Sequence, residues 1–185
     1  MSEPWLVIID PQTIFASPTS QWGSPAFPDV IGPINRLVEA YHGHIIVTRW
    51  IPSVTHEGSW HDYFQRWAFA DRPEDDPLFD LVEEARAWVE RPTVDITTFS
   101  KWGSQLSAIT GTYPHLLLTG VSTDCCVIAT ALAATDAGAW VKIVSDGCAG
   151  SSPQNHEAAL TVMDLYSPQI EILTASEALS GIRRR

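Results

Sequence analysis

Short apolar runs alternate with stretches of helical periodicity, and this alternation restricts the possible fold more than any other feature of the chain. The apolar runs predict strands at 5–9, 44–48, 94–98, 113–119, 139–145 and 169–173. Helical patterns fall between them at 29–41, 78–89, 124–137 and 155–166. Residues 49–76 interrupt the alternation as a long excursion, with a short helix expected around 60–67.

Strands that are buried on both faces and separated by helices form a parallel sheet, because each parallel crossover needs a long connection and is right-handed. The sequence therefore predicts an α/β fold with three layers, αβα, around a six-stranded parallel sheet. Strand order 3-2-1-4-5-6 is the expected arrangement for such a doubly wound sheet. The chain has 185 residues, of which 45% are hydrophobic and 18% charged, and this length and composition predict a single domain over 1–185.

Charge and cysteine content exclude several classes of function. Eleven basic against twenty-two acidic residues give a net charge of −11, which repels phosphate backbones and anionic membranes. The basic run is confined to Arg183–Arg185, so no nucleic-acid partner is expected. The chain shows neither a signal-like N-terminus nor the ~18 continuous apolar residues of a membrane span, which predicts a cytoplasmic protein with no membrane partner. Three cysteines without Cys-x-x-Cys spacing indicate neither a disulfide framework nor a zinc knuckle.

Three chemically apt residues follow predicted strands. Asp10 ends the first strand, Lys101 comes just after the third, and Cys126 comes just after the fourth. Ligands bind outside the carboxyl ends of parallel strands, where the strand order reverses. With the first and fourth strands adjacent, Asp10 and Cys126 would flank this crevice.

Cys126 opens an alanine-rich helical segment that runs to Gly138. The first N–H groups of a helix have no internal partners, so this position favours a thiolate over a thiol. The same N–H groups can receive a developing oxyanion. One turn could therefore supply both a nucleophile and the group that stabilises charge.

Each of these residues also has a structural interpretation. A cysteine at the start of such a helix is more often a small buried filler than a nucleophile. Asp10 alone could be a turn or cap residue, and Lys101 alone a solvated loop charge. Cys125 competes with Cys126 as the reactive thiol, and Cys148 is expected to be structural.

Several motifs in register resemble the isochorismatase-like cysteine hydrolases. The resemblance runs from about Trp5 to Leu173, and its most specific part is a Thr-x-x-Cys-Val-x-x-Thr-Ala block. The matching residues are Asp10-Pro11-Gln12 with Phe15, Lys101 with Ser104, Gly120 to Val127 with Thr130-Ala131, Asp146-Gly147, and His156 with Ala159-Leu160. This spacing selects Cys126 over Cys125.

The resemblance implies a catalytic triad of Asp10, Lys101 and Cys126. Asp10 would accept the thiol proton and deliver it to a leaving amine, while Lys101 would help the thiol to ionise. The resemblance also implies a cis Val121–Ser122 peptide bond and an oxyanion hole formed by the backbone N–H groups of Ser122 and Cys126. The attacked carbonyl would pass through a thioester before hydrolysis.

The sequence departs from the metal-binding branch of this family. Nicotinamidases carry an Asp-x-His-Pro element after the second strand, and the aligned residues here are Arg49-Trp50-Ile51-Pro52. Arginine and isoleucine cannot ligate a divalent cation, so no metal and no cofactor are expected. His56, His61 and Asp62 remain a weaker alternative for a different metal site.

Substrate contacts are expected from aromatic side chains at the rim of the crevice, because such walls are usual in small-molecule pockets. The candidates are Gln12, Phe15, Trp60, Trp67 and Trp102. Each aromatic residue could instead belong to the core or to a subunit interface. Gln12 could equally bind loop backbone.

Two polar residues near the crevice carry further interpretations. Arg49 could bind a substrate carboxylate or form an internal ion pair. Asp124, in the first turn of the helix that contains Cys126, is interpreted as a helix cap.

These features favour a metal-independent cysteine amidohydrolase that acts on a small carboxamide, ureido or carbamoyl compound. An isochorismatase-type enol-ether hydrolase and a non-catalytic binding or assembly subunit are the alternatives. Cys126 argues against the first alternative and the intact triad against the second. Eight tryptophans, together with the resemblance, favour a homodimer or homotetramer.

Overall fold

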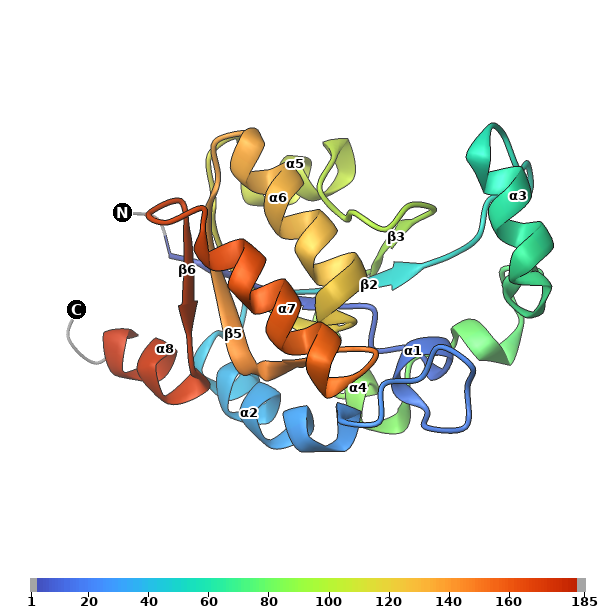
Figure 1. Ribbon diagram of the computed structural model, residues 1–185. Coiled ribbons are helices and arrows are strands. Elements are labelled where there is room, and N and C mark those ends of the chain that lie inside the picture. The colour runs from blue at the N-terminus through green and yellow to red at the C-terminus, as the bar shows by residue number, and fades with distance from the viewer. Residues whose placement is uncertain (1–2, 183–185) are drawn as a thin grey trace.

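A six-stranded, all-parallel sheet forms the centre of the protein in a computed structural model that describes residues 3–182 (Figure 1). The strand order is β3-β2-β1-β4-β5-β6, which confirms the predicted fold class and order. The strands are β1 (Trp5–Ile9), β2 (Ile45–Trp50), β3 (Val94–Ile96), β4 (His115–Val121), β5 (Trp140–Ala149) and β6 (Ile170–Leu173). The run Arg183–Arg185 lies outside the described residues.

Helices cover both faces of this sheet. Figure 1 shows α6 (Ile128–Asp136) and α7 (Pro153–Asp164) crossing one face together, with α2 (Phe27–Ala40) and α8 (Ala175–Ile182) on the other. The short helix α5 (Ser104–Thr110) packs on the same face as α6, because its Leu106 joins a cluster with Ile46 of β2. The other helical segments are α1 (Thr13–Ala16), α3 (Ser59–Arg66), α4 (Glu83–Arg86), the 3₁₀ turns Ala68–Ala70 and Pro77–Phe79, and a π-helical turn at Thr123–Val127.

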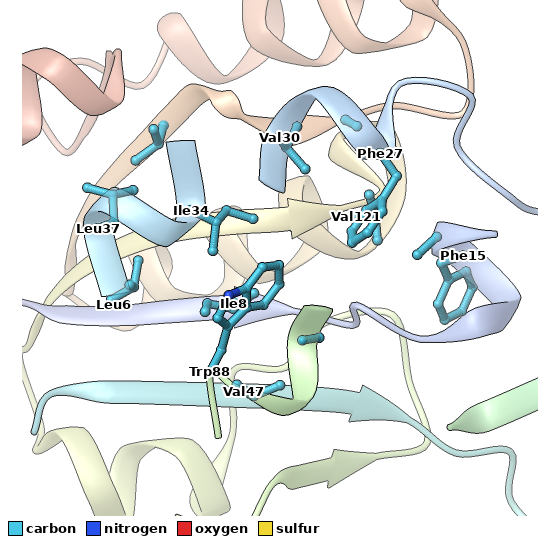
Figure 2. Packing of buried hydrophobic residues seen from close by; sticks show 14 of the residues in the cluster. Leu6, Ile8, Phe15, Phe27, Val30, Ile34, Leu37, Val47, Trp88 and Val121 are labelled. Carbon is cyan, nitrogen blue, oxygen red and sulfur yellow. The ribbon is translucent and has the colours of Figure 1, made fainter. Parts of the chain in front are cut away.

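The core consists of two layers that follow from strand alternation. Leu6 and Ile8 of β1 pack toward α2, whereas Val7 and Ile9 of the same strand join the cluster on the α6 and α7 side. Figure 2 shows the apolar stripe of α2 lying over β1 and β4. Burial of both strand faces explains why the strands are continuous apolar runs.

The predicted helix 78–89 is wrong for most of its length, because a 3₁₀ turn ends at Phe79 and tertiary hydrogen bonds hold the residues from Asp80 to Val82 outside any helix. Asp76 caps a 3₁₀ turn by accepting the N–H of Leu78 at 2.9 Å. The Val82 N–H then donates to Pro11 O at 3.0 Å, and the Thr13 N–H donates to Asp80 O at 2.9 Å. Within the predicted range, only the single turn α4 is α-helical.

Two short helices, α5 and α8, were not predicted from the sequence. With seven and eight residues, they give too few turns for a clear apolar period. β5 also extends to Ala149, four residues beyond the predicted end, because Gly120 and Val121 of β4 pair with Cys148 and Ala149. No helix within residues 3–182 has the length and apolar character needed to cross a membrane.

Gly120 lets β4 approach β1 closely at the end where the two strands meet the crevice. Its φ is +104°, a conformation that side chains with a Cβ rarely adopt. A Cβ at this position would lie 2.2 Å from the carbonyl oxygen of Ile9. Because that contact is with backbone, no rotamer change could relieve it.

Replacing Gly120 with alanine should therefore destabilise the fold more than φ alone explains. We expect Gly120→Ala to lower the free energy of unfolding by at least about 3 kcal/mol in urea titrations. Gly43 has a similar φ of +85° with no atom near its missing Cβ, so Gly43→Ala is the control and should cost about 1 kcal/mol. Equal losses in the two variants would contradict the role given to close strand approach.

Candidate active site

Asp10 directly follows β1, at the edge of the sheet where β1 and β4 both end. Ile9 is in register with Gly120, so the residue after Ile9 lies beside the turn that follows β4. Asp10 has a φ of 44°, a left-handed conformation that aspartate tolerates better than most residues. Its side chain is completely buried.

Lys101 neutralises Asp10 inside the protein. Its Nζ lies 2.9 Å from Asp10 Oδ2, and both side chains have no exposed surface. The ammonium also donates a hydrogen bond to Thr98 O at 2.9 Å. Because a buried charge is costly without a partner, each ion depends on the other for its place in the fold.

Thr48, on the neighbouring strand β2, fixes the Asp10 carboxylate. Its hydroxyl donates to Asp10 Oδ1 at 2.7 Å and accepts the Asp10 N–H at 3.2 Å. Within residues 3–182, Oδ2 receives no directed hydrogen bond and has only the ionic contact with Lys101. That oxygen therefore keeps a lone pair available for a proton.

Cys126 lies in the π-helical turn between β4 and α6 and is only 2% exposed. Its carbonyl accepts a 2.7 Å hydrogen bond from the Thr130 hydroxyl, which in turn accepts the Lys101 N–H at 2.8 Å. Thr130 thus ties the segment that bears Lys101 to the turn that bears Cys126. The structure brings Asp10, Lys101 and Cys126 into one site.

Backbone hydrogen bonds around Cys126 converge on the carbonyl of Ser122. The Val121–Ser122 peptide bond is cis. The Ser122 carbonyl accepts hydrogen bonds from the Cys125 N–H at 3.0 Å and from the Val127 N–H at 3.2 Å. It does not accept one from the N–H of Cys126, which lies between them in the sequence. The Ser122 N–H forms no backbone hydrogen bond within residues 3–182.

The resting state of Cys126 differs from the thiolate expected from its position on the helix. Its pKa is raised well above the ordinary thiol value by its hydrogen bond with Cys125, by complete burial and by the nearby Asp10 carboxylate. The ammonium of Lys101 lowers this pKa but is outweighed. The same hydrogen bond lowers the pKa of Cys125. Cys126 is therefore a neutral thiol that needs a base when it reacts.

A cavity of about 210 Å³ opens onto this turn. Its floor includes Ser122, Cys125 and Cys126, while Asp10 and Lys101 lie beneath the floor. The walls are aromatic and come from segments that are far apart in the sequence. These wall residues are Phe15, Trp22, Trp50, Tyr63 and Phe99.

Among the five predicted substrate contacts, only Phe15 lines this cavity. Gln12 is fully buried, and its amide is saturated by the backbone: its Nε2 donates to Trp50 O and Phe79 O, and its Oε1 accepts the Trp50 N–H. Its role is therefore to join the end of β2 to the 3₁₀ turn Pro77–Phe79.

The three predicted tryptophans lie outside the cavity wall. Trp60 borders a separate surface hollow and packs against Tyr63 and Phe99. Trp67 packs edge-on against Trp22 at 5.6 Å, behind the wall. Trp102 is half-buried between two core clusters. The first two support the wall residues, and Trp102 belongs to the core.

Trp22, Tyr63 and Phe99 were missed because nothing in their local sequence marks them as pocket residues. The ring centroids of Trp22 and Tyr63 are 5.8 Å apart, and those of Tyr63 and Phe99 are 5.6 Å apart. Three separate segments therefore converge at the wall. Figure 1 shows α3, which carries Tyr63, standing off the sheet on the long excursion. Only the folded path of that excursion brings its helix to the crevice.

The interpretation of Asp124 as a helix cap is wrong. Its carboxylate accepts the Ser151 N–H at 2.7 Å and the Ser151 hydroxyl at 2.6 Å, and forms no cap hydrogen bond. Asp124 and Ser151 both border the cavity. Asp124 therefore joins the Cys126 turn to the loop after β5.

The residues of this site do not fit the metal of the nicotinamidase branch. Arg49 makes a two-point ion pair with Asp95, and its Nε donates to Asp95 Oδ1 at 3.0 Å. His56 pairs with Asp71, whereas His61 contacts Gln65, so the alternative histidine site is not assembled. Within residues 3–182 no group of three His, Cys, Asp or Glu side chains is arranged to hold an ion.

Comparison with known proteins places this fold and site. The helix-flanked parallel sheet of this order matches the isochorismatase-like fold. The isochorismatase domain model matches residues 4–177, so the chain belongs to the isochorismatase family of hydrolases. No curated protein matches the sequence.

Solved structures share the fold at low sequence identity. An isochorismatase-like hydrolase from Alkaliphilus metalliredigens has a TM-score of 0.78 at 17% identity, covering 98% of both chains. A cysteine hydrolase from Pseudomonas syringae pv. phaseolicola 1448A has a TM-score of 0.81 at 18% identity, covering 100% of this chain and 99% of that one. N-carbamoylsarcosine amidase from Thermoplasma acidophilum has a TM-score of 0.70 at 16% identity, covering 94% and 97%.

The buried thiol of Cys148 makes stability depend on pH in the alkaline range. Burial raises its pKa, whereas in the unfolded chain the thiol ionises near pH ~8.5. Above that pH the unfolded state loses a proton that the folded state keeps, so stability falls as pH rises. We expect a contribution of up to about 1.4 kcal/mol per pH unit from this thiol. Urea unfolding of wild type and Cys148→Ala from pH 7 to 10 measures it: the variant should lose stability less steeply, and parallel curves would contradict the assignment.

Proposed function

We propose that this protein is a metal-independent cysteine amidohydrolase that cleaves the C–N bond of a small carboxamide, ureido or carbamoyl compound through a thioester. The observation that carries the proposal is the Asp10–Lys101 ion pair, buried beneath the Cys126 turn at the floor of an aromatic cavity. A base, a cation and a thiol at one small-molecule site are what such hydrolysis requires.

The first half of the reaction forms the thioester. Asp10 Oδ2 accepts the proton of the Cys126 thiol as the sulfur attacks the carbonyl carbon, and the carbonyl oxygen becomes an oxyanion. The N–H groups of Ser122 and Cys126 donate to that oxyanion. Asp10 then gives the proton to the leaving nitrogen, the C–N bond breaks, and ammonia or an amine departs.

The second half returns the enzyme to its resting state. Asp10 takes a proton from water, the water oxygen attacks the thioester carbon, and the C–S bond breaks as the proton returns to sulfur. The products are a carboxylic acid or carbamate and the free thiol. Lys101 takes no part in the proton transfers and holds the Asp10 carboxylate in place through their ion pair.

The likeness to N-carbamoylsarcosine amidase supports C–N bond cleavage as the reaction class. The high pKa of the Cys126 thiol supports a mechanism in which a carboxylate base removes its proton during attack. An enol-ether hydrolysis would leave the buried thiol without a role. Isochorismate therefore belongs in the assay panel as the competing substrate.

Replacing Cys126 should abolish turnover. We expect Cys126→Ala to lower the rate of ammonia release by at least ~10³-fold, because the nucleophile is lost. The amide panel comprises benzamide, nicotinamide, N-carbamoyl amino acids, ureidoacrylate, biuret and aliphatic amides, and isochorismate is assayed beside it for loss of substrate. Hydroxylamine added to the wild-type reaction should trap the thioester as a hydroxamate.

Cys125→Ala is the matched control, since it removes the adjacent thiol while keeping Cys126. We expect it to retain most of the activity and the hydroxamate product. Loss of activity in Cys125→Ala with retention in Cys126→Ala would assign the nucleophile to the other thiol. Turnover of isochorismate alone would favour enol-ether hydrolysis.

Chelation tests metal independence. Because Arg49 and Ile51 provide no ligands where the nicotinamidase branch binds its metal, we expect full activity after exhaustive dialysis against dipicolinate. Elemental analysis of the dialysed protein verifies metal removal. Activity that is lost on dialysis and restored by zinc, iron or manganese would refute this part of the proposal.

A further inference from the structure

Within residues 3–182, no cationic side chain lines the cavity. Its lining comprises aromatic, small, neutral polar and sulfur-bearing residues, together with the single carboxylate of Asp124. Ser151 donates two hydrogen bonds to that carboxylate, so the charge is fixed in place at the wall. A substrate anion would meet a carboxylate and no counterion.

The cations on neighbouring segments are committed to other partners. Lys101 is paired with Asp10 beneath the floor, and Arg49 is paired with Asp95. Arg66 stacks over the ring of Trp67, with its Cζ 5.4 Å from the ring centroid. None of the three lines the cavity.

The neutral part of the wall suits a flat apolar group. Trp22 and Phe15 lie parallel, with an interplanar angle of 1°, and Trp50 meets both rings edge-on. The volume of about 210 Å³ is below the ~300–1,000 Å³ of drug-sized ligand pockets, so the ligand is small.

Tyr63 adds an uncharged polar group to this wall. Its hydroxyl forms no hydrogen bond with any residue in the range 3–182, and its ring lines the cavity. Burial first, and then the two cysteines, raise its pKa, so the hydroxyl stays neutral and can donate to a substrate oxygen. Donation of this kind needs no charge on the substrate.

We propose that the site selects carboxamides or ureides whose remaining part is small, flat and uncharged, and that it rejects those bearing a carboxylate. The inference rests on the proposed function and specifies its substrate class. An unpaired carboxylate would lose its hydration in an aromatic cavity and would face Asp124. This predicted selectivity separates the protein from hydrolases of carboxylate-bearing substrates such as N-carbamoyl amino acids.

A matched pair of ligands tests the selectivity without requiring turnover. 4-Acetylbenzamide and 4-carbamoylbenzoate have nearly the same shape and one carboxamide each, and they differ by one negative charge. Binding to Cys126→Ala, and to Cys126→Ser should the first variant fail to fold, is followed by tryptophan fluorescence, since Trp22 and Trp50 line the cavity. We expect 4-acetylbenzamide and the smaller benzamide to bind at least ~100-fold more tightly than 4-carbamoylbenzoate.

The outcomes of this experiment are distinct from those of the activity assay. Equal or tighter binding of the carboxylate overturns the selectivity, and so does failure of both neutral amides to bind. Absence of Cys126-dependent turnover across the amide panel instead overturns the proposed function. Wild-type kcat/KM values for the matched pair should show the same preference as binding.

A variant designed to bind the carboxylate ligand gives a second, independent test. Gln21 is exposed and borders the cavity, so Gln21→Arg introduces the missing cation at its mouth. We expect it to raise the affinity for 4-carbamoylbenzoate relative to 4-acetylbenzamide by up to ~5-fold, as for an exposed ion pair. Gln21→Met, of similar length without charge, should leave that ratio unchanged. An equal shift in both variants would show that charge does not control the selection.

Discussion

The ion pair between Asp10 and Lys101 is the interaction on which the rest of the site depends. Two fully buried charges are costly to desolvate, and removing one partner leaves the other uncompensated. Thr48 and the Thr98 carbonyl satisfy further atoms of the pair, so β1, β2 and the loop after β3 are fixed to one point. A mobile loop could not hold a base beneath a thiol in this way.

Close approach of two strands brings the third member of the site to this pair. Gly120 brings β4 against Ile9, and the chain then turns so that Cys126 starts the path into α6. Thr130 connects that turn back to Lys101 through two hydrogen bonds. Backbone packing therefore sets the position of Cys126, and its hydrogen bond with Cys125 together with burial raises the pKa of its thiol.

The cavity above this floor depends on long connections between elements. Tyr63 comes from the excursion after β2, Phe99 from the loop after β3, and Trp22 from the loop after α1. The ring of Tyr63 contacts both Trp22 and Phe99, so the excursion after β2 connects the other two loops. A wall made of aromatic rings without a cation gives the site its character and underlies its proposed preference for uncharged substrates.

Strand periodicity by itself determined the parallel sheet and the edge at which Asp10, Lys101 and Cys126 follow their strands, because alternation of elements and crossover handedness are encoded locally. The strand order was an expectation for a doubly wound sheet, which the tertiary structure confirmed. The tertiary structure alone decided which aromatic residues line the cavity, since Trp60, Tyr63 and Trp67 all belong to α3 or its C-cap and only Tyr63 of the three lines it. It also decided the breaking of helix 78–89, where hydrogen bonds to the segment after β1 overrode local propensity. The raised pKa of Cys126 comes first from its hydrogen bond with the neighbouring Cys125, and then from burial and the Asp10 carboxylate, which depend on the tertiary structure.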